Sequence, residues 1–374
     1  MTDVSAAVAG WCQSGWLLAV VVPAAAVVGR LLTRGVRRVS GPPEAPGVER
    51  LVEVATVVAA VALWWWEIRT LGQLPDAVAA ADPGVVCLRY AAHMVLFALL
   101  AAAAWVDLRH RVIPDEITVP GVLAGLAWNA CLPATLLPVG HAVERSFAPP
   151  AIVPDVLGGF GPLHHPGLPG WATGVAGLAV AAALFVAWWW FGLPPAADGE
   201  PAGSGGGLLR LRLVVAVAGL AGLVAAWRVG GDHWAGLVTA LIGLGVAAGM
   251  IWATRIGASY ALGREAMGFG DVTLMAMAGS WLGWQACLLA CALAVFIGLA
   301  HGVLQLVRHS ESELPFGPSL CLALALVVVC WRPIWAAAAE QLGRPLELAA
   351  VVTLVILLTA VTLWAWMRLR RTAA

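Results

Sequence analysis

The sequence predicts an all-α, polytopic integral membrane protein with about 9–11 transmembrane helices. Of its 374 residues, 61% are hydrophobic and only 11% are charged, whereas ordinary soluble domains carry about 25% charged residues. The mean hydropathy of +0.89 points to the same class. A net charge of zero gives no reason to expect a nucleic-acid partner. The expected environment is therefore a lipid bilayer.

The apolar stretches locate the individual helices. A transmembrane helix needs roughly 20 predominantly apolar residues, and the stretches that come near this length lie at about 16–33, 51–68, 85–106, 117–137, 171–192, 208–227, 234–254, 271–284, 286–307, 317–331 and 348–367. The eighth and tenth stretches are short and could be tilted or partly re-entrant.

The arginines predict how these helices are oriented. Basic residues concentrate in the cytoplasmic loops of membrane proteins. In this chain they follow the odd-numbered stretches, at Arg30, Arg34, Arg37, Arg38, Arg50, Arg109, Arg111, Arg210, Arg212, Arg255, Arg264, Arg308, Arg368, Arg370 and Arg371. This pattern predicts an N-terminus outside, a cytoplasmic C-terminus, and a cytoplasmic location for both Asp107 and Asp271.

We divide the chain into five expected segments. They are N-terminal spans with a basic loop (1–84), helices around a first motif (85–137), an inserted loop with an extra helical pair (138–233), helices around a second motif (234–331) and a C-terminal span (332–374).

The first motif is DLRHRVIPD at 107–115. Asp107 ends an apolar stretch, and the dipole at a helix C-terminus disfavours an anion, so helix capping does not explain this carboxylate. An acid beside hydrocarbon is costly and marks a candidate functional site. We therefore expect Asp107 to have a functional role.

The second motif is GFGD at 268–271, directly before a helical run. Asp271 is either a functional acid or a simple N-cap. Gly268 and Gly270 permit backbone conformations closed to other residues and would let a substrate strand approach closely. The pairing of this motif with the first one on the same membrane face favours a functional role for Asp271.

The first motif contains four further residues of interest, and three of them have two alternative roles. Pro114 stops a helix from running through the loop. Asp115 opens the next helix and is either its N-cap or a second functional acid. Arg109 and Arg111 are either anchors at the cytoplasmic interface or partners of the Asp107 carboxylate.

Together these motifs resemble those of the type IV prepilin peptidases, which are membrane aspartic proteases of the G-x-G-D kind. The resemblance rests on DLRHRVIPD at 107–115, GREAMGFGDV at 263–272, the following Gly279 and LGW at 282–284, and PFGP at 315–318. It is clear over 85–137 and 234–330 and fainter over 16–50. The resemblance implies that Asp107 and Asp271 are the catalytic pair.

The chain departs from the family pattern in three places. Residues 34–50 hold no C-x-x-C zinc segment, Thr273 stands where the family usually has lysine, and 138–233 adds a helical pair. The missing cysteine pairs make the family's second activity, N-methylation of the new pilin N-terminus, doubtful. The seven cysteines are instead expected to pack as small hydrophobic side chains. Two extra helices preserve the sidedness of Asp271.

The resemblance implies an aspartic endopeptidase of the bacterial inner (cytoplasmic) membrane. Its substrate would be the basic leader of type IV prepilins or of type II secretion pseudopilins, cut at the cytoplasmic face. Asp107 and Asp271 would activate a water molecule, and Glu265 could attract the leader. We expect no cofactor and no metal, and the sequence does not predict an oligomeric state. The alternative is a secondary transporter that uses the same acids as a proton relay.

Overall fold

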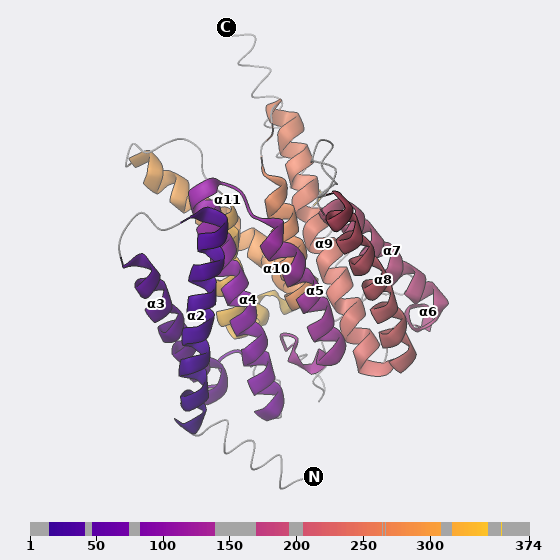
Figure 1. Ribbon diagram of the computed structural model, residues 1–374, viewed down its shortest axis with the longest axis horizontal. Coiled ribbons are helices and arrows are strands. Elements are labelled where there is room, and N and C mark those ends of the chain that lie inside the picture. Colours follow the sequence, from indigo (N-terminus) through magenta and orange to yellow (C-terminus); the bar gives the residue numbers. More distant parts are fainter. Residues whose placement is uncertain are drawn as a thin grey trace. The chain divides into compact units, whose positions relative to one another are not determined.

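The structure, a computed structural model, describes residues 15–41, 47–74, 83–138, 170–193, 205–263, 265, 267–307, 316–342 and 353, and every regular element in these ranges is a helix (Figure 1). In chain order the elements are η1 (Gly15–Leu17), α2 (Leu18–Ser40), α3 (Val48–Trp64), η2 (Trp65–Arg69), α4 (Pro83–His110), α5 (Asp115–Cys131), η3 (Pro133–Thr135), α6 (Gly170–Thr173), α7 (Val175–Gly192), α8 (Gly205–Val229), α9 (Gly231–Leu262), α10 (Phe269–Val307), α11 (Phe316–Val329) and α12 (Trp331–Leu342).

Seven of the described helices are long and apolar enough to cross a membrane, or eight if the bent pair formed by α11 and α12 is one span. The predicted all-α, polytopic class is therefore confirmed. The stretch predicted at 117–137 forms the shorter helix α5, of 17 residues. The stretch predicted at 348–367 lies outside the described residues, apart from Thr353.

Two predicted spans, 271–284 and 286–307, form the single element α10. It is broken at Gly283, whose φ of 78° and ψ of 176° are not helical. This combination of angles is open almost only to glycine. The break therefore falls where the sequence predicted a boundary, but no loop separates the two halves.

The chain forms two compact units. The first comprises Met1–Ile117, Ala134–Pro150 and Leu288–Ala337. The second comprises Thr118–Pro133, Ala151–Cys287 and Ala338–Ala374.

In the first unit, α2 and α3 form a helical hairpin that packs on α4 (Figure 1). The turn after α2 begins at Gly41, whose φ is 74° and whose N–H donates to the Arg37 carbonyl (3.0 Å). An ion pair at 3.7 Å joins Arg37 to Glu49 across this turn. The apolar core between the three helices consists of Val21, Ala25, Ala60, Leu63, Trp64, Ile68, Val86 and Tyr90.

The last helices of the first unit are α11 and α12, which meet at an angle of 87°. Helix α11 packs against α4 and buries one broad face, which includes Gly317, Leu320, Leu324 and Val328, while Leu322 and Leu326 on the opposite side are exposed. An apolar stripe of this kind is the face that a helix packs against its neighbours. This packing allows α11 to contact the end of α4 that carries Asp107.

In the second unit, α9 crosses the first half of α10 at two glycines. A Cβ added at Gly243 would collide with the carbonyl oxygen of Gly279, and one at Gly279 would collide with Gly243. Small residues let helix backbones approach closely in membranes. The crossing explains why glycine is required at 279, a position that the family resemblance had singled out.

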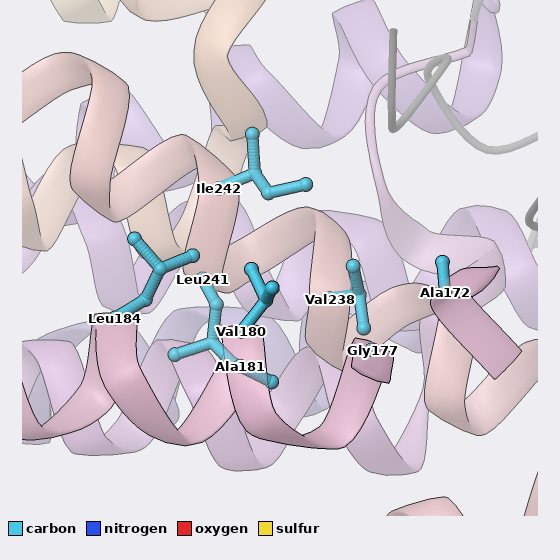
Figure 2. Close-up of a pocket in the computed structure, with 8 residues that line it drawn as sticks. All are labelled: Ala172, Gly177, Val180, Ala181, Leu184, Val238, Leu241 and Ile242. Carbon is cyan, nitrogen blue, oxygen red and sulfur yellow. The ribbon is translucent and has the colours of Figure 1, made fainter. Parts of the chain in front are cut away.

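Helices α7 and α8 lie where the extra helical pair was predicted, and they pack on each other and on α9. The Trp189 indole donates to the Arg212 carbonyl (2.9 Å), and the Arg212 guanidinium lies 5.2 Å from the centre of the indole ring. Between α7 and α9 lies an apolar hollow of about 20 Å³ (Figure 2), lined by Ala172, Gly177, Val180, Ala181, Leu184, Val238, Leu241 and Ile242. A hollow this small and apolar holds at most a water-sized molecule, so we attach no function to it.

Candidate active site

Asp107 lies in the last turn of α4 and is 6% exposed. The helix ends at His110, and the Arg111 N–H still donates to the Asp107 carbonyl (2.8 Å). Arg111 then adopts a left-handed backbone with a φ of 55°, a conformation that is uncommon outside glycine. The chain turns sharply at this point, so the end of α4 that carries Asp107 is followed directly by the start of α5.

Gly317, the second residue of α11, packs directly on the Asp107 carboxyl group. A Cβ at Gly317 would collide with Asp107 Oδ2 and would lie 3.1 Å from both Asp107 Cγ and Ile113 Cδ1. The backbone at the N-terminus of a helix carries a partial positive charge that favours an anion. The start of α11 therefore offsets the unfavourable dipole that Asp107 meets at the end of its own helix.

Asp115 is the first residue of α5 rather than its N-cap, because the Pro114 carbonyl accepts the first hydrogen bond, from the Ile117 N–H (3.1 Å). An acid in the first turn still interacts favourably with the helix dipole. Burial raises the pKa of the Asp115 carboxyl group, and the neighbouring Glu116 carboxylate raises this pKa further. The N-cap alternative is therefore wrong in detail, although the location at a helix start is confirmed.

Asp271 is the third residue of α10 and is 7% exposed. It is inside the first turn and is not the N-cap that the sequence left open. The neighbouring Thr273 hydroxyl donates to the Gly270 carbonyl (3.0 Å), so this threonine satisfies a local backbone group. The second unit thus presents a buried carboxylate at the positive end of a helix.

The glycines of the second motif do not have the backbone conformations that we expected. Neither Gly268 nor Gly270 has a positive φ, whereas Gly263, which ends α9, has a φ of 65°. The special backbone therefore lies five residues before Gly268. Among the described residues, a Cβ at Gly268 would have only the Gly270 nitrogen within 4 Å, at 3.9 Å. Close approach of a substrate strand at Gly268 stays a prediction.

Arg255, on α9, braces the loop in front of Asp271. Its Nε donates to the Met267 carbonyl (2.9 Å), and its Nη2 pairs with Glu265 Oε1 (2.5 Å). The guanidinium carbon also lies 5.8 Å from the centre of the Phe269 ring. From the sequence, Arg255 was expected only to anchor the chain at the cytoplasmic interface, so this role was not predicted. Glu265 remains largely exposed, but its charge is partly compensated by this partner.

The roles of Asn129 and Trp281 were also not predicted from the sequence. The Asn129 amide donates to the carbonyls of Ser280 (2.7 Å) and Trp281 (3.3 Å), just before the break in α10. In return the Trp281 indole donates to the Gly121 carbonyl (2.9 Å). These bonds tie α5 to the first half of α10, which carries Asp271 in its first turn. The sequence feature that could have indicated this role is the amide side chain of Asn129, which stands alone within an apolar stretch.

The predicted site residues thus fall into two groups. The first unit brings Asp107, Pro114, Asp115 and Gly317 to adjoining helix ends, with Arg109 half-buried and Arg111 exposed in the same turn. The second unit holds Asp271 with Gly268, Gly270 and Glu265. In the part of the chain that the structure describes, no group of three or more His, Cys, Asp or Glu side chains could hold a metal ion.

One family of known proteins matches part of the chain. Residues 206–303 match the model of the type IV leader peptidase family. This range starts inside the segment that we expected to be an insertion, and it includes all of α8 except Gly205. It includes Asp271 but not Asp107.

Individual relatives agree with this match. The chain is 36% identical over 104 residues to a prepilin leader peptidase/N-methyltransferase of Aeromonas salmonicida, covering 24% of this chain and 36% of the relative. It is 45% identical over 64 residues to that of Pseudomonas aeruginosa, covering 16% and 22% respectively, and 32% identical over 76 residues to that of Escherichia coli, covering 20% and 34%. No solved structure matches. The chain thus aligns with only about a fifth to a third of the length of these relatives. The predicted resemblance is confirmed, and the chain is related to the type IV prepilin peptidases through the stretch that contains Gly268–Asp271.

Proposed function

We propose that this chain is an aspartic endopeptidase of the bacterial inner membrane that removes the leader peptide of type IV prepilins or pseudopilins at the cytoplasmic face. One observation carries the proposal: each unit holds a buried aspartate in the end turn of a helix, Asp107 or Asp271, inside a motif of this peptidase family. The names of the matched relatives support the same activity.

In the proposed mechanism Asp107 and Asp271 form a catalytic pair. Two carboxyl groups that lie close together cannot both ionise easily, so they share a proton and titrate as a unit. The ionised carboxylate takes a proton from water as the water oxygen attacks the scissile carbonyl carbon. The protonated partner donates to the carbonyl oxygen. When the C–N bond breaks, a proton passes to the leaving amine.

Cys87 supports the cytoplasmic orientation of Asp107. Contrary to the expectation that the cysteines are only small hydrophobic side chains, Cys87 is disulfide-bonded. It lies near the N-terminal end of α4, and Asp107 lies near the other end. A helix rises about 1.5 Å per residue, so the two positions are about 30 Å apart, which is the thickness of the hydrocarbon core. Disulfides persist in oxidising compartments such as the periplasm, and this supports the proposal that the Asp107 end of α4 lies on the cytoplasmic side.

The proposal includes recognition of the substrate but not its methylation. The open space beside Gly268 suits an extended peptide, and the exposed Glu265 suits a basic leader. N-methylation is not included, because residues 34–50 hold no C-x-x-C pair, even though the matched relatives are also named N-methyltransferases. A transporter function is not proposed, because the relatives carry peptidase names.

Leader cleavage by the purified full-length chain tests this proposal. The chain would be reconstituted in proteoliposomes with a synthetic prepilin segment that has a basic leader, a glycine before the cut and an apolar helix after it. We expect a mature N-terminus directly after the glycine, identified by mass spectrometry. The matched control is the Asp107→Asn/Asp271→Asn double variant. An intact substrate after incubation with folded, inserted wild-type protein would contradict the proposed function.

Arg255→Ala should slow cleavage by roughly tenfold, because the loop before Asp271 loses a charge-assisted hydrogen bond to the Met267 carbonyl. Glu265→Gln removes the ion pair with Arg255 but leaves the hydrogen bond from Arg255 to the Met267 carbonyl. It therefore tests the ion pair separately from the support that Arg255 gives to the loop. We expect Glu265→Gln to lower kcat less than Arg255→Ala does. A rise in KM for Glu265→Gln would show that Glu265 helps to bind the basic leader. The reverse order of kcat effects would show that Arg255 acts mainly through Glu265.

A further inference from the structure

We propose that a polar cluster remote from Asp107, formed by Trp66, Glu67, Gln73 and His93, positions Asp107 by holding α11 in register along α4. The inference rests on the proposed function for the role of Asp107. All residues of the argument belong to the first unit. The four residues are called the register cluster below.

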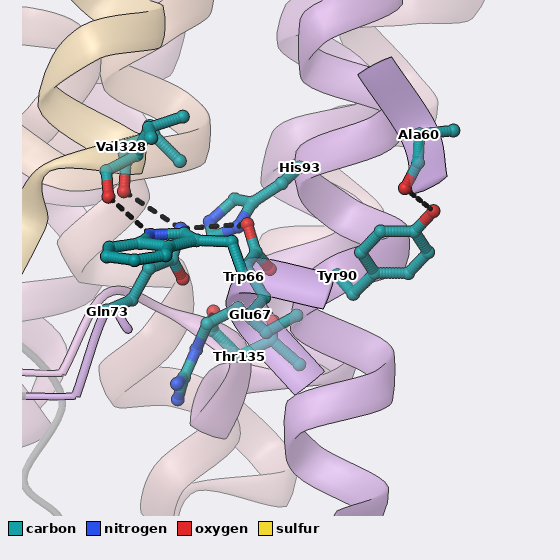
Figure 3. Close-up of polar contacts among 10 residues, drawn as sticks. Ala60, Trp66, Glu67, Gln73, Tyr90, His93, Thr135 and Val328 are labelled. Atoms are coloured by element: carbon teal, nitrogen blue, oxygen red, sulfur yellow. Dashed lines mark hydrogen bonds and ion pairs between the residues drawn. The ribbon is translucent and has the colours of Figure 1, made fainter. Parts of the chain in front are cut away.

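The register cluster links α4 to α11 through a chain of hydrogen bonds (Figure 3). Glu67 Oε1 lies 2.7 Å from His93 Nδ1 on α4 and accepts a bond from Gln73 Nε2 (2.8 Å). The same Gln73 nitrogen donates to the Val328 carbonyl of α11 (2.8 Å). The Trp66 indole donates to the next carbonyl, that of Val329 (2.7 Å). Glu67, Gln73 and His93 are each only 3% exposed.

The two carbonyls that this cluster binds lie at the point where α11 ends. The chain bends by 87° into α12 after Val329, and the last carbonyls of a helix have no partner within that helix. In a membrane protein such groups must be satisfied internally. Gln73 and Trp66 do this with side chains from a distant part of the sequence, and they thereby fix the C-terminal end of α11.

The backbone around the register cluster is built to present these side chains. Residues Trp65–Arg69 form a π-helix, a rare element that occurs frequently at functional sites. Leu71 follows with a φ of 51°. A Cβ at Gly72 would collide with the Trp66 indole, so glycine is needed for the ring to lie where it reaches Val329.

The opposite end of α11 is the one that contacts Asp107. Gly317 packs on the Asp107 carboxyl group without an intervening side chain. His93 and Asp107 are fourteen residues apart on α4, about 21 Å at 1.5 Å per residue. Helix α11 is therefore attached to α4 at both ends, and it runs antiparallel to α4. A shift of α11 at the register cluster is transmitted to Asp107, because helices move as stiff units.

Simple packing does not account for this cluster. Glu67 Oε2 is buried and has no hydrogen-bond partner in the described ranges, and a buried unsatisfied carboxylate oxygen costs stability. Apolar side chains of similar size could fill the same space without this cost. Specific positioning of α11 explains why polar groups are present.

The test compares Gln73→Leu and Trp66→Phe with Trp65→Phe, each in an Ile113→Cys background. Ile113 touches Gly317 and is 5% exposed, so its thiol should be protected from a water-soluble maleimide. Trp65 is the neighbouring tryptophan and is largely exposed. Labelling of the peptide that contains residue 113 is followed by mass spectrometry, which separates it from the native cysteines.

We expect labelling at residue 113 to become about fivefold faster or more when one α11 bond is lost, and to stay unchanged in Trp65→Phe. In the parent background, Gln73→Leu and Trp66→Phe should lower the kcat of leader cleavage and leave KM unchanged. Thermal unfolding shows whether each variant is folded. If Gln73→Leu is not folded, Trp66→Phe alone is compared with Trp65→Phe.

Unchanged protection of residue 113 in folded Trp66→Phe would overturn the inference, whatever the activity. Faster labelling together with wild-type kcat would also overturn it, because α11 would then move without affecting Asp107. If the labelling increases but no form of the protein cleaves a leader, the positioning of α11 stands and the proposed peptidase function fails.

Discussion

Asp107→Asn and Asp271→Asn should each reduce leader cleavage by roughly a thousandfold or more, because acid–base catalysis by a positioned carboxyl group contributes up to about 10⁴-fold. Asparagine has nearly the same shape as aspartate but can neither take the proton from water nor return it. Each aspartate is buried at a helix end, so the amide should fit without unfolding the protein. Cleavage is measured by mass spectrometry, and folding by thermal unfolding in detergent.

Asp115→Asn is the matched control for this result. Asp115 lies in the same motif, eight residues after Asp107, and its side chain is half-buried at the start of α5. An amide at this position leaves the helix start intact, so we expect only a mild loss of activity. If Asp115→Asn is inactive while Asp107→Asn still cleaves, the first catalytic carboxylate has been assigned to the wrong residue.

Gly317→Ala should lower kcat by about a hundredfold, because small misplacements of a catalytic group can have effects of this size. The added methyl group would collide with Asp107 Oδ2 and press on Ile113 Cδ1. Overpacking of this kind costs about 1–3 kcal/mol, so the folded state should survive with a lower Tm. The expected signature is a loss of kcat far larger than the loss of stability suggests.

Gly298→Ala provides the comparison for Gly317→Ala. Gly298 lies on α10 near the start of α11, but its Cβ would meet the Phe316 ring at 3.7 Å and the Ser319 hydroxyl at 3.9 Å. These are ordinary van der Waals contacts, so activity and Tm should change little. Equal losses of activity in both variants would argue against a special contact between Gly317 and Asp107.

The sequence predicted the helical class and both aspartate motifs because these features are local. Apolar length predicts a helix, and an acid beside hydrocarbon is conspicuous in any stretch. The contact of Gly317 with Asp107 was not predictable in this way, because the two residues are 210 positions apart. Only the family resemblance singled out 315–318, and it assigned no role to Gly317.

A local pattern also misled at the second motif. Gly268 and Gly270 were expected to have unusual backbone angles, but glycine permits such angles without requiring them. The boundary predicted between 271–284 and 286–307 lies close to the break at Gly283, although no loop separates the two halves of α10. Hydropathy does not distinguish a break inside a helix from a short loop.

The central claim is that Asp107 and Asp271 converge on one water molecule, and cysteine cross-linking tests it most directly. Both aspartates would be replaced, as Asp107→Cys and Asp271→Cys, and the membrane-inserted protein treated with a short bifunctional thiol reagent. Catalytic carboxylates that share a proton lie about 3 Å apart, so we predict rapid cross-linking of the peptides that contain residues 107 and 271. Efficient labelling of both thiols by a monofunctional reagent, with no cross-link between them in folded protein, would contradict the account.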